Sequence, residues 1–199
     1  MKLPLSWIRE FVDLPKNISI EEIVAGFVKV GFEVEGVENP AAAITGPLVI
    51  GRVESIEELT GLKKPIRYVG LNCGEAKVRH VICGATNFAV GDLVVVALPG
   101  AILPGNFAIS ARETYGKTSN GMICSSRELG LGDDHNGIIV IHDTKIKPGA
   151  QALEVLGAND PIIDIAVNPD RGYAMSVRGA SRELAMSLNR PFKDINAQS

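Results

Sequence analysis

The first apolar residues of the chain recur with the spacing of an amphipathic helix. Between residues 20 and 27 they fall three or four positions apart, so they share one helix face. Ser19 and Glu22 have the spacing of a capping box, in which each side chain bonds a free amide at the helix start. Gly31 can take the left-handed conformation that ends a helix. The pattern predicts a capped helix between Ser19 and Gly31.

Shorter elements flank this helix. Residues 32–37 begin by alternating apolar and acidic side chains, as a half-buried strand does. Before the helix, Ser6 is the expected N-cap of a short helix that Pro15 ends. The apolar face of that short helix would be formed by Trp7, Ile8, Phe11 and Val12.

The pattern changes after a run of small residues from Asn39 to Pro47, which we interpret as a linker. Apolar stretches become short and are separated by glycines and other turn residues. Five strands are predicted, over residues 48–56, 67–73, 77–83, 92–97 and 137–141. Strands of this number and spacing favour a sandwich or a small closed barrel, and the OB fold is a common five-stranded barrel.

Beyond Pro148 the alternating and helical patterns return. Residues 163–167 predict a strand, and residues 172–188 predict a helix whose apolar stripe is Tyr173, Val177, Ala180, Leu184 and Leu188. Because the two ends resemble each other more than the middle, we predict an α+β protein. A five-stranded OB barrel (39–151) would be inserted into a small discontinuous α+β domain (1–38 plus 152–199), as surface loops allow.

Composition narrows the possible partners. Hydrophobic residues make up 46% of the chain and charged residues 22%, and the net charge is −3. Nucleic-acid binding through a large overall positive charge is therefore disfavoured. Any RNA contact would have to use a local group of basic residues. No apolar stretch reaches the length of a membrane span, and the first residues lack the apolar core of a signal peptide. We expect a cytoplasmic protein without a membrane partner.

Cysteine and histidine positions do not suggest a metal site. Cys73, Cys83 and Cys124 are odd in number and form no Cys-x-x-Cys pair, so we interpret them as buried thiols in a reducing compartment. His80, His135 and His142 have no ligand spacing to carboxylates or cysteines. Residues 133–137 contain two aspartates but lack the other ligands of a calcium loop, and they predict a hairpin turn.

Four stretches together resemble the beta chain of bacterial phenylalanyl-tRNA synthetases. They are Met1–Ile8, Val81–Asn87, Ser119–Ser125 and Ser176–Ala185, in the order and spacing of that family. The second and third also resemble a tRNA-binding module that occurs beside some methionyl-tRNA synthetases and as a free-standing protein. The resemblance covers the whole chain. The chain is similar to the N-terminal segment of the family's beta chains, which contains a tRNA-binding OB domain.

The resemblance implies a subunit of a heterotetramer of two alpha and two beta chains that attaches phenylalanine to tRNA with ATP and magnesium. In that family the aminoacylation site lies on the alpha chain, and the editing, magnesium-binding and anticodon-binding regions lie later in the beta chain. This segment would then have no catalytic residue, metal site or cofactor of its own. Its implied partners are tRNA, the alpha subunit and the later beta domains.

Two positions depart from the family pattern. The last helix of the family usually follows Pro-Asn-Arg-x-Asp, whereas this chain has Asp170 and Tyr173 at the second and fifth positions. A turn or cap bond from these positions is therefore in doubt. Related modules often carry an arginine before Ser-x-Gly-Met. Here Lys117 occupies that region, and it would supply a point charge without the forked donors of arginine.

Candidate tRNA contacts are the basic residues and amides of the barrel, because RNA binding needs positive charge for phosphates and amides or rings for bases. They are Lys63, Lys64, Arg67, Lys77, Arg79, Asn87, Arg112, Lys117, Ser119, Asn120, Met122 and Arg127. Residues 119–122 are favoured, because a polar turn beside an exposed methionine is poorly explained by core packing. Against this, residues 39–151 contain ten acids beside eleven basic residues, so an ordinary solvated surface stays an alternative.

Other functions remain open at this point. The barrel could be a structural or protein-interaction module without RNA affinity, which the low aromatic content of 5% favours slightly. A stand-alone tRNA-binding protein is a further alternative, although the helices at both ends argue against it. Arg171, Arg178 and Arg182 would form a stripe on the last helix, and salt bridges explain them better than phosphate contacts.

Overall fold

The computed structural model describes residues 1–62, 64–134, 136–143 and 145–194. The chain divides into two compact units. One unit is built from both ends of the chain, Met1–Asn39 and Asp160 onward, and the other is Pro40–Asn159. Residues 152–159, predicted in the outer domain, belong to the second unit, because Ala152 is buried in its core.

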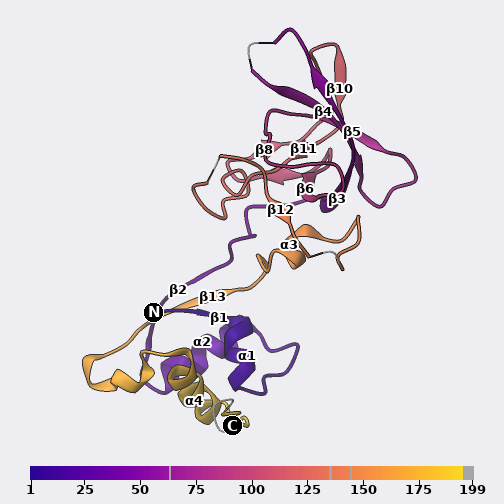
Figure 1. The fold of residues 1–199 in the computed structure, drawn as a ribbon. Helices are drawn as coiled ribbons and strands as arrows, with labels where there is room; N and C mark the ends of the chain where they lie inside the picture. The colour runs from indigo at the N-terminus through magenta and orange to yellow at the C-terminus, as the bar shows by residue number, and fades with distance from the viewer. Residues whose placement is uncertain (63, 135, 144, 195–199) are drawn as a thin grey trace. The chain divides into compact units, whose positions relative to one another are not determined.

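A three-stranded antiparallel sheet forms one layer of the first unit (Figure 1). Strand β13 (Ile162–Ala166) lies in the centre between β1 (Lys2–Pro4) and β2 (Glu33–Glu38). A register shift lies between Asp164 and Ile165 where β13 pairs with β2. Leu3, Ile163 and Ile165 are fully buried, so this sheet has one apolar face, as antiparallel sheets commonly do.

Helices cover that apolar face (Figure 1). They are α1 (Leu5–Phe11), α2 (Ile20–Lys29), the 3-10 helix η1 (Pro169–Ala174) and α4 (Val177–Ser187). The capping box at the start of α2 is present, since the Ser19 hydroxyl accepts from the Glu22 amide and the Glu22 carboxylate accepts from the Ser19 amide. Gly31 follows the helix at φ +83°, as predicted.

Two helix starts differ from the prediction. The first helix begins at Leu5 with Pro4 at the N-cap position, and the Ser6 hydroxyl donates to Asp160 instead of capping the helix. The last helix begins only at Val177, because Pro169 starts a 3-10 turn and the Ser176 hydroxyl then caps the Gly179 amide. Trp7 and Tyr173, predicted on apolar faces, are exposed.

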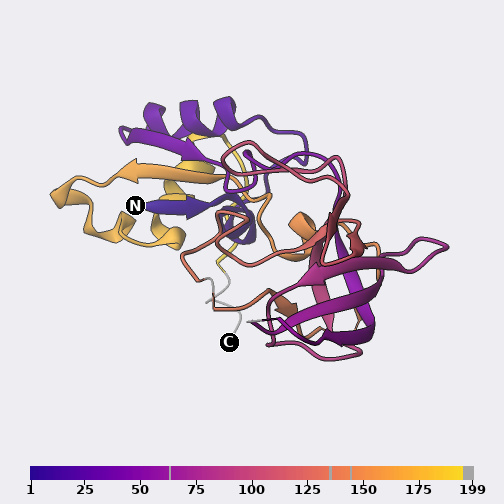
Figure 2. The ribbon, with the colours of Figure 1, turned by 90° about the horizontal axis from the view of Figure 1, so that it is seen from above.

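The second unit is the nearly closed five-stranded antiparallel barrel that the sequence predicted (Figures 1 and 2). Its long strand β3 (Leu48–Leu59) pairs with β6 (Leu93–Ala97) through its first half and with β4 (Ile66–Asn72) through its second half. Strand β5 (Arg79–Cys83) pairs with β4. Two short strands, β11 (Met122–Ile123) and β12 (Val140–Ile141), complete the sheet beside β6.

The fifth strand of the barrel is therefore split into β11 and β12, whereas a single strand over residues 137–141 was predicted. Gly137 and Ile138 lie outside the ladder, because the side chain of Asn87 occupies the backbone groups of Ile138. On the other edge, the Asn120 amide donates to the His80 carbonyl, 2.8 Å away. This bond joins the segment before β11 to β5 and nearly closes the barrel.

The segment between β6 and β11 contains two hairpins that were not predicted. They are β7–β8 (Ile102–Leu103 and Phe107–Ala108) and β9–β10 (Arg112–Thr114 and Lys117–Ser119). Apolar side chains of this segment, together with the short helix α3 (Ala152–Val155), cover the outer face of β3 and β6. The five residues of β6 are buried on both faces for this reason. No helix in the described part of the chain is long and apolar enough to cross a membrane.

Candidate nucleic-acid interface

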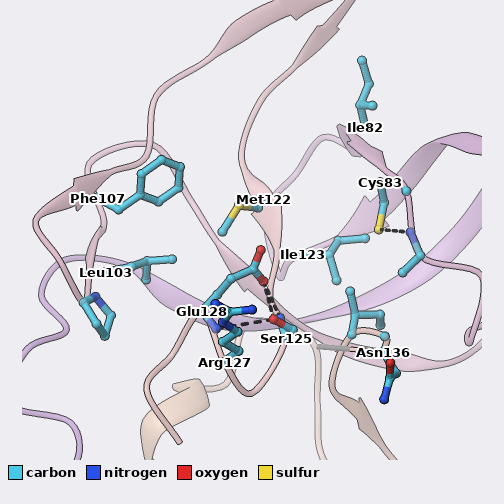
Figure 3. Close-up of a pocket in the computed structure, with 15 residues that line it drawn as sticks. Ile82, Cys83, Leu103, Phe107, Met122, Ile123, Ser125, Arg127, Glu128 and Asn136 are labelled. Atoms are coloured by element: carbon cyan, nitrogen blue, oxygen red, sulfur yellow. Dashed lines mark hydrogen bonds between the residues drawn. The ribbon is translucent and has the colours of Figure 1, made fainter. Parts of the chain in front are cut away.

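A groove of about 750 Å³ opens on the barrel between the end of β5, the β7–β8 hairpin and the turn that follows β11 (Figure 3). Its apolar floor includes Ile82, Leu103 and Ile123. Polar groups at the rim come from Arg127, Glu128 and the segment 136–138. A concave apolar surface with a few placed polar groups is the usual form of a ligand site.

Phe107 forms one wall of this groove and is 43% exposed. Gly105 and Asn106 both have positive φ, and this tight turn directs β8 back against β7, so that Phe107 pairs with Leu103. The guanidinium of Arg112 stands 5.6 Å from the ring centroid of Phe107. Arg112 lines a smaller adjoining hollow of about 180 Å³ and not the larger groove. The ring therefore borders both the hollow that Arg112 lines and the larger groove.

Glu128 is exposed and is held in a fixed orientation at the rim of the groove. Its Oε2 accepts from the Ser125 amide at 2.6 Å and from the Ser125 hydroxyl at 2.8 Å, and the same hydroxyl accepts from the Glu128 amide. Figure 3 shows these bonds beneath Met122. Within the described residues Oε1 has no bonding partner, so it is a fixed acceptor facing the groove.

Three of the predicted cations are engaged inside the barrel unit. Arg67 bonds Glu58 and the Phe88 carbonyl, and Arg79 forms a forked bond with Glu75 and donates to the Asn120 carbonyl. Lys117 lies 3.1 Å from a Glu57 oxygen.

Lys117 also stands 4.8 Å from the ring centroid of Tyr68, and that ring is stacked on His80. These contacts connect β10 to β4 and β5. The charges of Arg67, Arg79 and Lys117 are therefore partly neutralised by contacts within the barrel unit.

Four other predicted cations form no ion pair within the described residues. They are Lys64, Lys77, Arg112 and Arg127, and all four are exposed. Lys64 lies in the β3–β4 loop and Lys77 in the β4–β5 turn, where it borders a hollow of about 450 Å³ beside Asn120. Lys63 lies outside the described residues. These four cations, without an ion pair among the described residues, are the ones best placed to meet phosphates.

The predicted amide and turn residues are partly structural. Asn87 uses its amide on the backbone of Ile138. The Ser119 hydroxyl accepts from the Ile82 amide at 2.9 Å and donates to the Gly121 carbonyl. Met122 is only half-buried and lines both the groove and the adjoining hollow. Of this set, the side chains of Met122 and Asn120 are the two without a structural bond among the described residues.

Sequence reasoning missed the aromatic residues of this surface. The low aromatic content favoured a barrel without stacking surfaces, yet Phe107 and Tyr115 are exposed. Tyr115 takes a positive φ of 53° at the tip of the β9–β10 hairpin, followed by Gly116. The signals were local: each aromatic lies within one residue of a glycine or asparagine with positive φ, and such turns direct side chains to solvent.

The three cysteines are free and buried. Burial raises the pKa of the Cys73 thiol to about 11 and that of the Cys124 thiol to about 12. It also raises the pKa of Cys83, which lines the groove. These thiols stay protonated and unreactive near neutral pH. Among the described residues, no group of three or more His, Cys, Asp or Glu side chains is placed to hold a metal ion.

Comparison with known families decides what kind of barrel this is. Residues 48–151, just over half of the chain, match the family described as "Putative tRNA binding domain". The chain belongs to this tRNA-binding-domain family. The matched residues include β3 to β12 and every wall of the groove.

The whole chain is similar to longer proteins. It is 53% identical to the phenylalanine–tRNA ligase beta subunit of Thermobifida fusca and 51% identical to that of Streptomyces avermitilis, over 98% of its length in each case. It spans about a quarter, 24%, of the length of these relatives. The resemblance to the phenylalanyl-tRNA synthetase beta chain is confirmed.

Among solved structures, the CsaA chaperone of Picrophilus torridus matches 52% of this chain and 88% of its own, with 9% identity and a TM-score of 0.39. A likeness this distant supports no conclusion about function.

Proposed function

We propose that this chain is a non-catalytic part of a phenylalanine–tRNA ligase beta subunit and that its barrel binds tRNA. The match of residues 48–151 to the tRNA-binding-domain family carries this proposal. The similarity of the full chain to named beta subunits supports the choice of parent enzyme. The alpha subunit and the later beta domains would be its protein partners, and the cytoplasm its location.

Catalysis would take place outside this segment. The parent enzyme would use ATP and magnesium, and both would bind outside this segment. The first unit, with its buried sheet and helices, would serve assembly with neighbouring domains.

The tRNA contacts of the barrel would be local and electrostatic. The net charge of −3 provides no general attraction for RNA. Lys64, Lys77, Arg112 and Arg127 are exposed and form no ion pair with the residues that the structure describes, so each can meet a phosphate without breaking such a pair. The side chains of Arg67, Arg79, Lys117, Ser119 and Asn87, and the backbone of Asn120, would support this surface mainly by holding its strands and turns in place.

Binding of the chain to tRNA across a salt series, followed by fluorescence anisotropy, tests the proposal. Each phosphate contact contributes a slope of about −0.7 to −0.9 in a plot of log K against log salt. The Lys64→Ala/Lys77→Ala double variant should therefore lose about 1.4 to 1.8 of that slope. The matched control is Lys16→Ala, an exposed lysine of the first unit, which should leave the slope unchanged. Absence of tRNA binding at low salt would refute the proposal.

A structural or protein-interaction role for the barrel is a second candidate. It is favoured by the internal engagement of Arg67, Arg79 and Lys117, which removes charge from the surface. On this alternative the salt series shows no binding, while the barrel still folds and associates with the rest of the ligase.

A further inference from the structure

We propose that the groove beside Phe107 binds one unpaired nucleotide and selects bases that carry an exocyclic amine. The base would stack on the groove face of Phe107 and donate from its amine to Oε1 of Glu128, and a flanking phosphate would meet Arg127. This inference rests on the proposed tRNA-binding function and adds a base preference to it.

The stacking surface is available on one side only. Arg112 covers the face of Phe107 that looks into the smaller hollow, at 5.6 Å from the ring centroid. Phe107 also lines the larger groove, with the half-buried thioether of Met122 beside it. A cation on one face of a ring leaves the opposite face free to stack, and base stacking on aromatic rings is the general means of holding unpaired nucleotides. The volume of about 750 Å³ is ample for a single base and its sugar.

The polar groups of the groove determine the orientation of the nucleotide. Glu128 places a negative charge at the rim, which repels a phosphate and favours a neutral donor. Arg127 lies at the rim, is exposed and forms no ion pair within the described residues. The base must therefore enter toward Glu128 with its phosphate toward Arg127.

The fixed geometry of Glu128 accounts for the base preference. Its Oε2 already accepts two hydrogen bonds from Ser125, so rotation of the carboxylate is restrained and Oε1 alone faces the groove. An acceptor in this position suits the amine of cytosine or adenine. Uracil has carbonyl oxygens on both sides of its single ring donor, and these oxygens would lie close to the carboxylate and be repelled.

The same hydrogen-bond geometry indicates a substitution that should reverse the base preference. In Glu128→Gln the amide oxygen would take the place of Oε2, because the Ser125 backbone amide at that position can only donate. The amide nitrogen would then face the groove as a donor. Such a donor suits O4 of uracil and opposes the amine of cytosine, so the preference should change from cytosine toward uracil.

The experiment compares binding of the chain to fluorescently labelled C8 and U8 RNA and to unmodified tRNA, at constant salt. Wild type should bind C8 several-fold more tightly than U8, and Glu128→Gln should abolish or reverse this ratio. Glu113→Gln is the matched control, since it removes the same charge from exposed β9 outside the groove, and its ratio should equal that of wild type. Phe107→Leu should weaken C8 binding by about 5- to 150-fold, the loss of one base stack.

Equal binding of C8 and U8 by wild type, or an unchanged ratio in Glu128→Gln, would overturn the base preference. If tRNA still bound with a steep salt dependence, the proposed function would stand without it. Cytosine-selective binding of short RNA without any binding of tRNA would support the groove and refute the tRNA-binding role. Thermal unfolding of each variant verifies that the barrel remains folded, as the retained Ser125 bonds predict for Glu128→Gln.

Discussion

The amide side chain of Asn87 forms two hydrogen bonds with the backbone of Ile138. Its Nδ2 donates to the Ile138 carbonyl at 2.8 Å, and its Oδ1 accepts from the Ile138 amide at 3.0 Å. The Asn87 side chain thus takes the place of a paired strand for Ile138, which lies 51 positions further along the chain. Ile138 itself is buried in the barrel core, so its backbone groups cannot easily turn to water instead.

We expect Asn87→Ala to destabilise the barrel by about 1–3 kcal/mol, the usual range for leaving buried backbone groups unpaired. Asn87→Asp should also destabilise the barrel, because its carboxylate can accept from the Ile138 amide but places an oxygen against the Ile138 carbonyl. Urea denaturation monitored by circular dichroism measures both. Equal stability of wild type and Asn87→Ala would show that the two bonds contribute nothing net.

Gly179 lies where α4 meets the preceding 3-10 helix, and a Cβ at this position would overlap the carbonyl oxygen of Tyr173. Gly179→Ala should destabilise the first unit by about 1–3 kcal/mol, since backbone must move to make room. Gly172→Ala is the control, because a Cβ there meets no atom within 4 Å. Comparable unfolding midpoints for the two variants would contradict this packing explanation.

The capping box of α2 is expected to contribute measurably to the first unit. Ser19→Ala removes the acceptor for the Glu22 amide and should cost about 0.5–2 kcal/mol. Asn17→Ala changes a nearby exposed residue without a bond in the described structure and should be close to neutral. Hydrogen exchange at the first amides of α2 provides a local readout: Ser19→Ala should accelerate exchange there and Asn17→Ala should not.

Alkaline pH should destabilise the barrel through its buried thiols. Burial raises the pKa of Cys124 to about 12, whereas an unfolded thiol ionises near pH 8.5. The unfolded state therefore loses protons first, and stability falls as pH rises through this window by about 1.4 kcal/mol per unit for each such thiol.

Cys124→Ala should reduce this fall between pH 8.5 and 10, as measured by urea unfolding at several pH values. An identical pH dependence in wild type and variant would show that Cys124 does not stay protonated in the folded state. Labelling of native protein by a thiol reagent at pH 7.5 should be slow, and rapid labelling would conflict with the burial of all three cysteines.

The sequence alone determined the local features of this protein. The Ser19–Glu22 capping box, the stop at Gly31 and the strands around residues 48–56 and 92–97 were predictable, because each depends on hydrogen bonds or burial patterns within a few residues. The free buried cysteines were predictable from their number and spacing. The family resemblance also needed only motifs of contiguous residues.

Tertiary structure decided which of the candidate residues are available for a ligand. Sequence places Arg79 and Lys77 two residues apart, yet only Arg79 meets Glu75 and the Asn120 carbonyl, and no local pattern distinguishes them. The ring of Phe107 and the carboxylate of Glu128 face one groove only because two hairpins and a split fifth strand close the barrel around them. Such contacts depend on strand pairing between distant residues, which propensity and spacing do not encode.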